Sequence, residues 1–327
     1  MTGFKALNNK NGIALFVVLW MVALLAVIVG EFCHAMRTEI NITRNFKESA
    51  ESYYIALAGI NRSVAELLIR EHSKPELLTP EENAYETDEI EWRVGADIAP
   101  VLFGSGAYKV IITNESGKIN INKADKNTLI MLLNAFDIDE NEKDIITDSI
   151  LDWRDKDNLH HLNGVEDDYY LSLDPPYECK DSEFDAVEEL LLVKGVTEKI
   201  FYDGLESMVT VYSETDKINI NAASEKMLLS MPRMTESAAQ EIIEHRGSQE
   251  IKSLSELNEI IGPDIYAGIK SYISLKMSPF YAIKSFGGIT GSSIKEGIEA
   301  LIKTDAASDK GYRMIRWTDS VEDQFVF

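Results

Sequence analysis

An uninterrupted run of apolar residues near the amino terminus is the strongest hydrophobic pattern in the chain. Residues 13–30 carry no charged side chain. In a helix this run spans about 27 Å, close to the hydrocarbon thickness of a bilayer. Lys5 and Lys10 precede the run, and no acidic residue does. This charge bias predicts a transmembrane helix over 13–33, with a cytoplasmic amino terminus and an exported carboxy-terminal domain.

Three interpretations of this segment compete. A cleaved secretory signal has a shorter apolar core and a small-residue exit, whereas Glu31 and Phe32 follow this run. A plain signal anchor is the second interpretation. The third, a type IV pilin-like leader that is cut after a glycine just before the apolar helix, fits the Gly12-Ile13 junction best. It predicts a leader over 1–12, cleavage between Gly12 and Ile13, and N-methylation of Ile13.

An amphipathic pattern continues beyond the membrane segment and predicts that one helix runs from about 13 to about 71. At 1.5 Å per residue this helix would be near 90 Å long, with its part outside the membrane over 34–74. Pro75 and Pro80 are expected to end it. The apolar stripe recurs at helical spacing and consists of Phe46, Ala50, Tyr53, Leu57, Ile60, Val64, Leu67 and Leu68.

Alternating patterns on both sides of a helical region predict a small sheet. We expect strands at 90–94 and 108–112, and again at 280–286, 294–302 and 312–317. Helix-like segments fill the sequence between them. The prediction is therefore an α+β protein with a head over 75–122 and 279–327, interrupted by an α-helical domain over 123–278.

The inserted segment contains an internal repeat. Lys-Ile-Asn-Ile-Asn occurs at 118–122 and again at 217–221, and each copy precedes two helix-like stretches. This predicts two related units over 118–212 and 217–277. Within them, 188–200 and 254–266 each have the helix, glycine turn and helix order of a helix-hairpin-helix unit, with Gly195 and Gly262 in the turns.

The charge of the chain bears on its function. The formal net charge is −23, which disfavours binding to nucleic acid because phosphate contacts are made chiefly by Lys and Arg. Acidic residues also crowd both hairpin units, so we interpret these as packing elements and not as a DNA-binding surface. Cys33 and Cys179 are far apart in the sequence and are expected to be unpaired thiols. The sequence has no cluster of His and Cys that would predict a zinc site. His160 and His161 are adjacent, so their side chains point apart and are not expected to share a metal ion.

The order of these features resembles one protein family, the minor pseudopilin K of type II secretion systems (GspK family). The resemblance covers nearly the whole chain. It depends on the Gly12-Ile13 junction, Val17 where pilins carry Glu, the two Lys-Ile-Asn-Ile-Asn segments, 151–157 with 163–170, and 184–195. It implies a pilin-like αβ head with an inserted α-domain, and a place at the pseudopilus tip beside minor pseudopilins I and J.

Acidic residues are dense between 151 and 185. Loop carboxylates are the ligands that calcium prefers, but a solvated acidic loop explains the same composition. The spacing excludes an EF-hand. The resemblance implies calcium in the inserted domain. The expected ligands are Asp155, Asp157, Glu166 and Asp168, with Asp152 and Asp167 as further members.

These features predict a non-enzymatic subunit that is held in the bacterial inner membrane by one helix, with its carboxy-terminal domain in the periplasm. It would help to initiate pseudopilus assembly and export across the outer membrane. The further partners implied by the resemblance are the major pseudopilin, the prepilin peptidase and the inner-membrane assembly platform. Two alternatives stay open. One is a membrane-anchored helix-hairpin-helix DNA receptor of an uptake system, and the other is a membrane-anchored enzyme that uses the acidic cluster with a metal.

Overall fold

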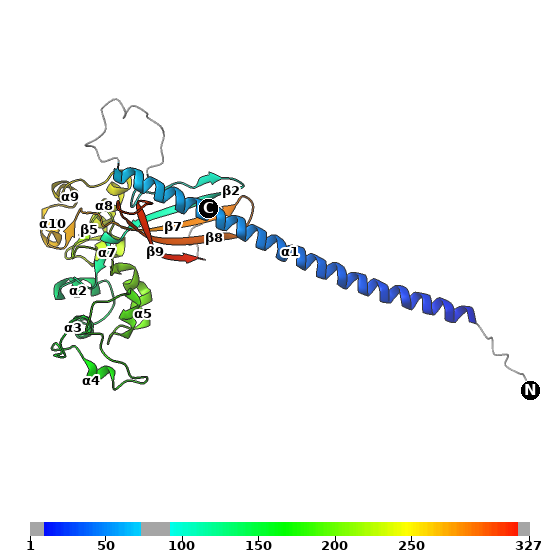
Figure 1. Cartoon of the computed structure of the whole chain (residues 1–327), viewed down its shortest axis with the longest axis horizontal. Coiled ribbons are helices and arrows are strands. Elements are labelled where there is room, and N and C mark those ends of the chain that lie inside the picture. Colours follow the sequence, from blue (N-terminus) through cyan, green and yellow to red (C-terminus); the bar gives the residue numbers. More distant parts are fainter. Residues whose placement is uncertain (1–9, 73–91, 320–327) are drawn as a thin grey trace, which may run out of the picture.

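The computed structural model describes residues 10–72 and 92–319 of the chain. A single helix, α1 (Lys10–His72), projects far from a folded head and lies along one side of it with its carboxy-terminal half (Figure 1). The long continuous helix predicted from the sequence is therefore confirmed. Within the described residues, α1 is long and apolar enough to cross a membrane. Pro75 and Pro80 lie outside the described residues.

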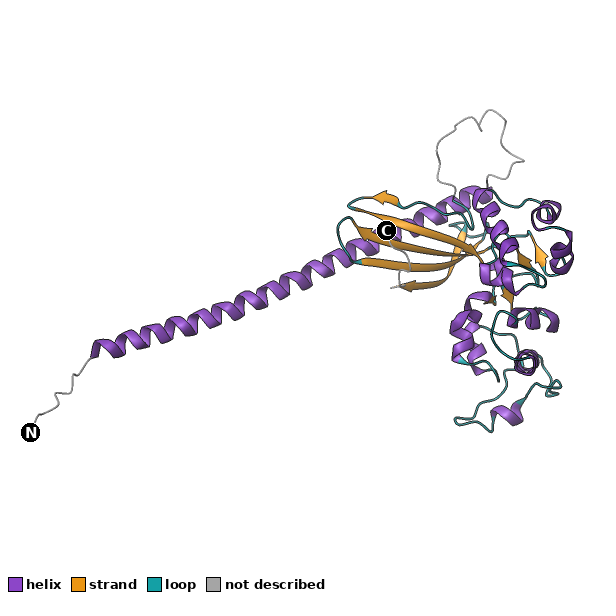
Figure 2. Ribbon diagram, turned by 180° about the vertical axis from the view of Figure 1, so that it is seen from behind, coloured by secondary structure: helices purple, strands orange, loops and turns teal. Residues whose placement is uncertain are grey.

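Five antiparallel strands form the sheet of the head, in the order β1-β2-β7-β8-β9. Figure 2 draws this sheet in orange beside the long helix. The strands are β1 (Val101–Phe103), β2 (Gly106–Asn114), β7 (Phe280–Ile289), β8 (Lys295–Thr304) and β9 (Tyr312–Asp319). The four strands predicted within 108–112 and 280–317 are confirmed. The strand predicted at 90–94 is wrong for its described part, because Trp92–Val94 run as an irregular segment whose Trp92 and Val94 side chains fill the head core.

The face that α1 presents to the sheet differs from the predicted stripe. Ile60, Val64 and Leu67 are buried as expected, but Phe46 and Ala50 are exposed. Small buried residues occupy this face instead, and these are Ser52, Ala56, Gly59 and Ser63. An analysis that counts apolar residues misses such a face, because close helix-to-sheet packing depends on small side chains as much as on apolar ones.

Between β2 and β7 the chain forms the inserted helical domain, which has a core of its own. Its short strands pair in parallel, β3 (Ile119–Asn120) with β4 (Val209–Thr210) and β5 (Ile218–Asn219) with β6 (Ile273–Ser274). Its first helices are η1 (Glu115–Gly117), α2 (Lys126–Leu133), α3 (Glu140–Arg154), α4 (Asp167–Tyr170), η2 (Val187–Leu192), α5 (Glu198–Ile200), η3 (Phe201–Leu205) and α6 (Glu206–Met208). The later helices are α7 (Glu225–Ser230), α8 (Glu236–Ser248), α9 (Leu254–Ile261) and α10 (Pro263–Ile269).

The sequence repeat corresponds to a repeated set of contacts. Asn122 exchanges two hydrogen bonds with the backbone of Phe184, and Asn221 does the same with Ile251. Arg154 at the end of α3 donates to the carbonyls of Ile121 and Ala124. In the second unit, Arg246 of α8 donates to the corresponding carbonyls of Ile220 and Ala223. The two Lys-Ile-Asn-Ile-Asn segments therefore have the same structural role, which is to join the strand of each unit to its helices.

Candidate cation site in the inserted domain

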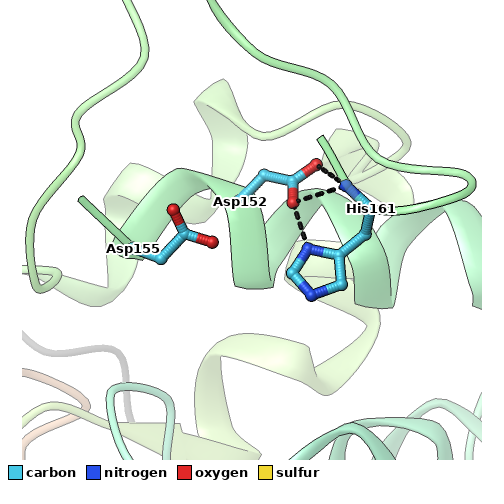
Figure 3. A group of neighbouring side chains, drawn as sticks. All are labelled: Asp152, Asp155 and His161. Atoms are coloured by element: carbon cyan, nitrogen blue, oxygen red, sulfur yellow. Dashed lines mark hydrogen bonds and ion pairs between the residues drawn. The ribbon is translucent and has the colours of Figure 1, made fainter. Parts of the chain in front are cut away.

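Helix α3 carries the first group of possible metal ligands at its carboxy-terminal end. A capping box formed by Asp139 and Glu142 begins this helix, and Asp155 is its carboxy-terminal cap. Asp152, on the last turn, is fully buried. Ligand atoms of Asp152, Asp155 and His161 lie within 4.8 Å of one another, and Figure 3 shows the three side chains converging.

Hydrogen bonds hold this first group in place. The His161 backbone N–H lies 3.0 and 3.2 Å from the two carboxylate oxygens of Asp152, and the His161 Nδ1 contacts the same carboxylate (Figure 3). The hydrogen bond to Asp152 raises the pKa of His161. Burial, together with the carboxylates of Asp157 and Asp152, raises the pKa of Asp155. The negative charge here is therefore only partly compensated by protein groups.

A second group comes from two separate segments. Glu166 precedes α4, and Cys179 and Asp181 follow it in the next loop. Their ligand atoms also lie within 4.8 Å of one another. Glu166 is only 3% exposed, and among the described residues neither of its carboxylate oxygens has a hydrogen-bond partner. The same holds for Asp181 Oδ1. Buried carboxylate oxygens without donors are costly, so their placement fits a bound cation.

Electrostatics connect the two groups. Burial, together with the nearby carboxylates of Asp152, Asp155 and Asp181, raises the pKa of Glu166 to about 7. Clustered carboxylates repel one another unless a proton or a cation compensates their charge. Calcium takes six to eight oxygen ligands, and the carboxylates of these two groups are ligands of that kind.

The structure distributes the predicted ligands unevenly. Asp152, Asp155 and Glu166 lie in the two groups. Asp157 and Asp168 are exposed, and their carboxylates accept hydrogen bonds from the nearby backbone N–H groups of Leu159 and Tyr169. Asp167 accepts from the Cys179 backbone N–H at 2.8 Å. It is therefore adjacent to the second group without belonging to it.

His161, Cys179 and Asp181, which belong to the two groups of possible metal ligands, are not among the ligands predicted from the sequence. Asp181 was one of many acids in this segment, and the adjacency of His160 and His161 argued against a metal role. The conformation of the loops places these residues beside the other possible ligands. Asp181, for example, has a φ of 50°, in the left-handed region that favours glycine. No periodic pattern predicts this conformation.

An aromatic cluster fixes the loops around both groups. The ring of Trp153 packs edge-on against Tyr170 and Tyr177 and is stacked on Phe184. The Tyr177 hydroxyl donates to the Leu192 carbonyl at 2.8 Å. Because Trp153 lies beside Asp152 on α3, this packing connects the acidic groups to the core of the inserted domain.

The two hairpin units do not form a basic surface. Gly195 and Gly262 have positive φ values of 87° and 80°, as tight turns require. The hollow beside Gly195 is lined by charges of both signs, from Asp137, Glu142, Asp203, Lys194 and Lys199. Gly262 lies between the acidic residues Glu259 and Asp264. This composition does not favour contact with phosphate groups.

Family models match two parts of the chain. Residues 111–214 match the model described as type II secretion system, protein K, and residues 213–274 match a helix-hairpin-helix motif. Type II secretion system protein K of Pseudomonas aeruginosa is 26% identical over 258 residues, which cover 75% of each chain. The homologous protein of Pectobacterium carotovorum is 26% identical over 273 residues, covering 77% of this chain and 80% of that protein.

A solved structure has the same fold. It is titled the GspK-GspI-GspJ complex from the type 2 secretion system of enterotoxigenic Escherichia coli. The match has a TM-score of 0.53 at 15% identity and covers 88% of this chain and 99% of the matched chain. This chain has that fold, with a long apolar amino-terminal helix on an antiparallel sheet and a helical domain inserted between its strands. The chain is therefore similar to type II secretion system protein K in sequence and in fold.

Proposed function

We propose that this chain is the minor pseudopilin at the tip of a type II secretion pseudopilus, assembled with minor pseudopilins I and J. The observation that carries the proposal is the arrangement of α1. One face of its outer half packs on β2, β7 and β8, while the opposite face stays exposed with large apolar residues. Phe46 is 73% exposed and Tyr54 is 66% exposed. Such a face suits the packing of neighbouring helices in a filament bundle.

Two features support a place at the tip. The inserted domain widens the head well beyond the sheet (Figure 1), so a further subunit above it would have to avoid this bulk. Val17 replaces the Glu that pilins use to pair with the amino terminus of a neighbouring subunit. A subunit without that carboxylate cannot form this ion pair with the amino terminus of a neighbouring subunit. The role is structural, and no catalytic step is assigned to the acidic groups.

Co-purification tests this proposal. The full chain, extracted in mild detergent, is expected to retain I and J homologues that are expressed with it. Phe46→Asp combined with Tyr54→Asp should abolish this retention. Tyr202→Asp serves as the matched control because it also charges an exposed aromatic residue but lies in the inserted domain, away from α1. A wild-type chain that retains neither homologue would contradict the proposal.

The membrane topology and processing belong to the same proposal. The segment 13–33 would hold the subunit in the inner membrane, with the head in the periplasm. The prepilin peptidase would cut between Gly12 and Ile13 and methylate Ile13, and the assembly platform would then add the subunit beside the major pseudopilin. The apolar helix α1 and the similarity to type II secretion system protein K support this route.

Calcium is the proposed structural cofactor. The unsatisfied oxygens of Glu166 and Asp181 support it, and Asp155 is the adjacent ligand from the sequence-predicted set. Asp152 would orient the site through His161. Bound calcium would supply the positive charge that the clustered carboxylates lack, and would fix the loop between α3 and η2.

The DNA-receptor alternative has a direct test. A gel shift of the full chain with duplex DNA at low salt should show no retained complex, because hairpin units in DNA receptors need basic residues beside their glycines. Salt-sensitive retention that is lost in Lys194→Glu would instead favour the receptor.

A further inference from the structure

Two leucines project into solvent from the loop that joins α3 to α4. Leu159 is 78% exposed and Leu162 is 92% exposed. A single exposed leucine is ordinary on a protein surface, but these two lie three residues apart in one short loop. Apolar side chains that gather at one exposed place are typical of a surface that another molecule covers.

Buried carboxylates on α3 impose this exposure. The backbone N–H of His161 donates to Asp152 at 3.0 Å. The backbone N–H and the side-chain amide of Asn163 both donate to Asp148, at 3.2 and 3.1 Å. Both acceptors are fully buried. The residues on either side of Leu162 are therefore fixed to α3, and the loop cannot turn its leucines inward without leaving buried carboxylates short of donors.

The loop lies at an outer end of the molecule. It precedes α4, which is at the end of the inserted domain farthest from the sheet of the head (Figure 1 and Figure 2). The same views show this domain extending away from the line of α1. The loop is therefore far from the exposed α1 face around Phe46 and Tyr54, which we assign to I and J homologues. A molecule that covers the leucines is accordingly not one that packs on α1.

The border of the leucine pair is mainly acidic. Asp157 and Asp168 are exposed, and Asp167 accepts a hydrogen bond at 3.4 Å from the side chain of Asn158 in the same loop. Lys156 is an exposed basic residue beside them. An acidic border attracts Lys and Arg side chains and repels anionic lipid headgroups. The charge therefore favours a protein surface with basic residues over a membrane.

We propose that Leu159 and Leu162 dock into an apolar pocket on a partner protein other than I and J, and that Lys or Arg residues bordering this pocket face Asp157 and Asp168. Such a contact has the usual arrangement of an interface, with an apolar centre and a polar rim. The loop needs no rearrangement, because α3 already holds it in place. The proposal requires neither calcium binding nor the packing of other subunits on α1.

A photo-reactive residue tests the proposal with little risk to folding, because position 162 is almost fully exposed. p-Benzoylphenylalanine replaces Leu162 in the full chain, which is expressed in the cells that normally produce it and irradiated there. We expect one protein adduct, and mass spectrometry should locate it at apolar residues flanked by Lys or Arg. The same replacement at Leu192, a 45% exposed leucine on η2, is the matched control and should not give this adduct.

Charge removal tests the border. Asp157→Asn combined with Asp168→Asn should lower the yield of the adduct about fivefold or more, because the attraction to basic residues is lost while the asparagine oxygens can still accept the local hydrogen bonds. Glu241→Gln combined with Glu259→Gln removes two exposed acids of the second unit and should leave the yield unchanged. A yield that neither pair changes would overturn the proposal, and far-ultraviolet circular dichroism verifies folding.

The identity of the adduct decides between the possible occupants. Adducts with lipid alone would place the leucines against a membrane, and adducts with an I or J homologue would place them inside the tip complex. Either result would overturn the proposal, as would the absence of any adduct from position 162. Retention of I and J homologues is measured separately by co-purification, so that failure of the tip assignment is distinguished from failure of this proposal.

Discussion

Gly287 of β7 lies directly against Ser52 of α1, so that a Cβ at position 287 would be 2.3 Å from the Ser52 carbonyl oxygen and 2.4 Å from the Ala56 nitrogen. Both neighbours are backbone atoms of a long helix, so they cannot rotate away. The closest approach of helix and sheet is therefore set by a glycine on one side and a serine on the other.

Gly287→Ala is expected to destabilise the head. The added methyl group must push α1 off the sheet, and overpacking of this kind costs about 1–3 kcal/mol of unfolding free energy. Gly288→Ala is the matched control, since its Cβ would find only the Lys295 Cγ at 3.4 Å and the Ile294 carbonyl oxygen at 3.9 Å. Urea denaturation of both variants checks this, and equal midpoints would contradict the close contact.

Asn122→Ala and Asn221→Ala should weaken the two units of the inserted domain to a similar degree. Each substitution removes both hydrogen bonds to a distant backbone segment and leaves the Phe184 or Ile251 backbone groups without these partners. The expected loss is about 1–3 kcal/mol of unfolding free energy per variant. Asn127→Ala, at an exposed position of α2, should change it by less than about 0.5 kcal/mol. A large difference between the two variants would contradict equivalent roles.

Asp148→Asn should destabilise the chain in a pH-dependent way. Asp148 is fully buried, and burial alone would raise its pKa, but hydrogen bonds from Lys126 and Asn163 outweigh this and lower the pKa. A lowered folded-state pKa stabilises the chain above the unfolded value of about 3.9, and this stabilisation is lost as pH falls through the folded value. The variant should therefore be less stable than wild type at pH 7 and differ less at about pH 3.

Urea midpoints at the two pH values measure this effect. Asp137→Asn, at an exposed position just before α3, is the control and should show no such difference. A destabilisation by Asp148→Asn that is equal at both pH values would mean that packing, and not the carboxylate charge, is what the residue contributes.

Calcium should raise the melting temperature of the chelator-treated full chain. Binding to the folded state alone adds about 2.7 kcal/mol at a concentration of 100 times Kd. Glu166→Gln should lose most of this shift. Asp168→Asn should keep it, because the Asp168 carboxylate is exposed and lies outside both groups. A shift that Asp168→Asn also abolishes would favour the ligand set predicted from the sequence, which contains both residues, over the one that the structure brings together.

Gly12→Leu should block processing of the leader. Intact mass and amino-terminal sequencing of the membrane fraction should give N-methylated Ile13 for wild type and Met1 for the variant. Gly30→Ala, also on α1 and with open space around it, should be processed normally. A wild-type chain that begins at Met1, or one cut near Ala35, would contradict the pilin-like route.

The sequence alone determined the features that depend on local pattern. The apolar run after Gly12, the long helix, the strands after Phe280 and the repeated Lys-Ile-Asn-Ile-Asn units could all be predicted, because hydrophobic periodicity and repeated residues report directly on secondary structure. Asp152, Asp155 and Glu166 could also be named from the sequence, because dense carboxylates in one short segment are visible without coordinates, and the structure places them in the two groups.

Only the tertiary structure decided which surfaces meet. The face of α1 that packs on the sheet contains Ser52 and Gly59, and small residues give no hydrophobic signal. The second group joins Glu166 to Cys179 and Asp181 across a loop, whereas Asp157 and Asp168 are exposed although they are closer in sequence to the other acids. Such proximity depends on loop conformations with no period, fixed by the Trp153 aromatic cluster and by backbone hydrogen bonds between distant segments.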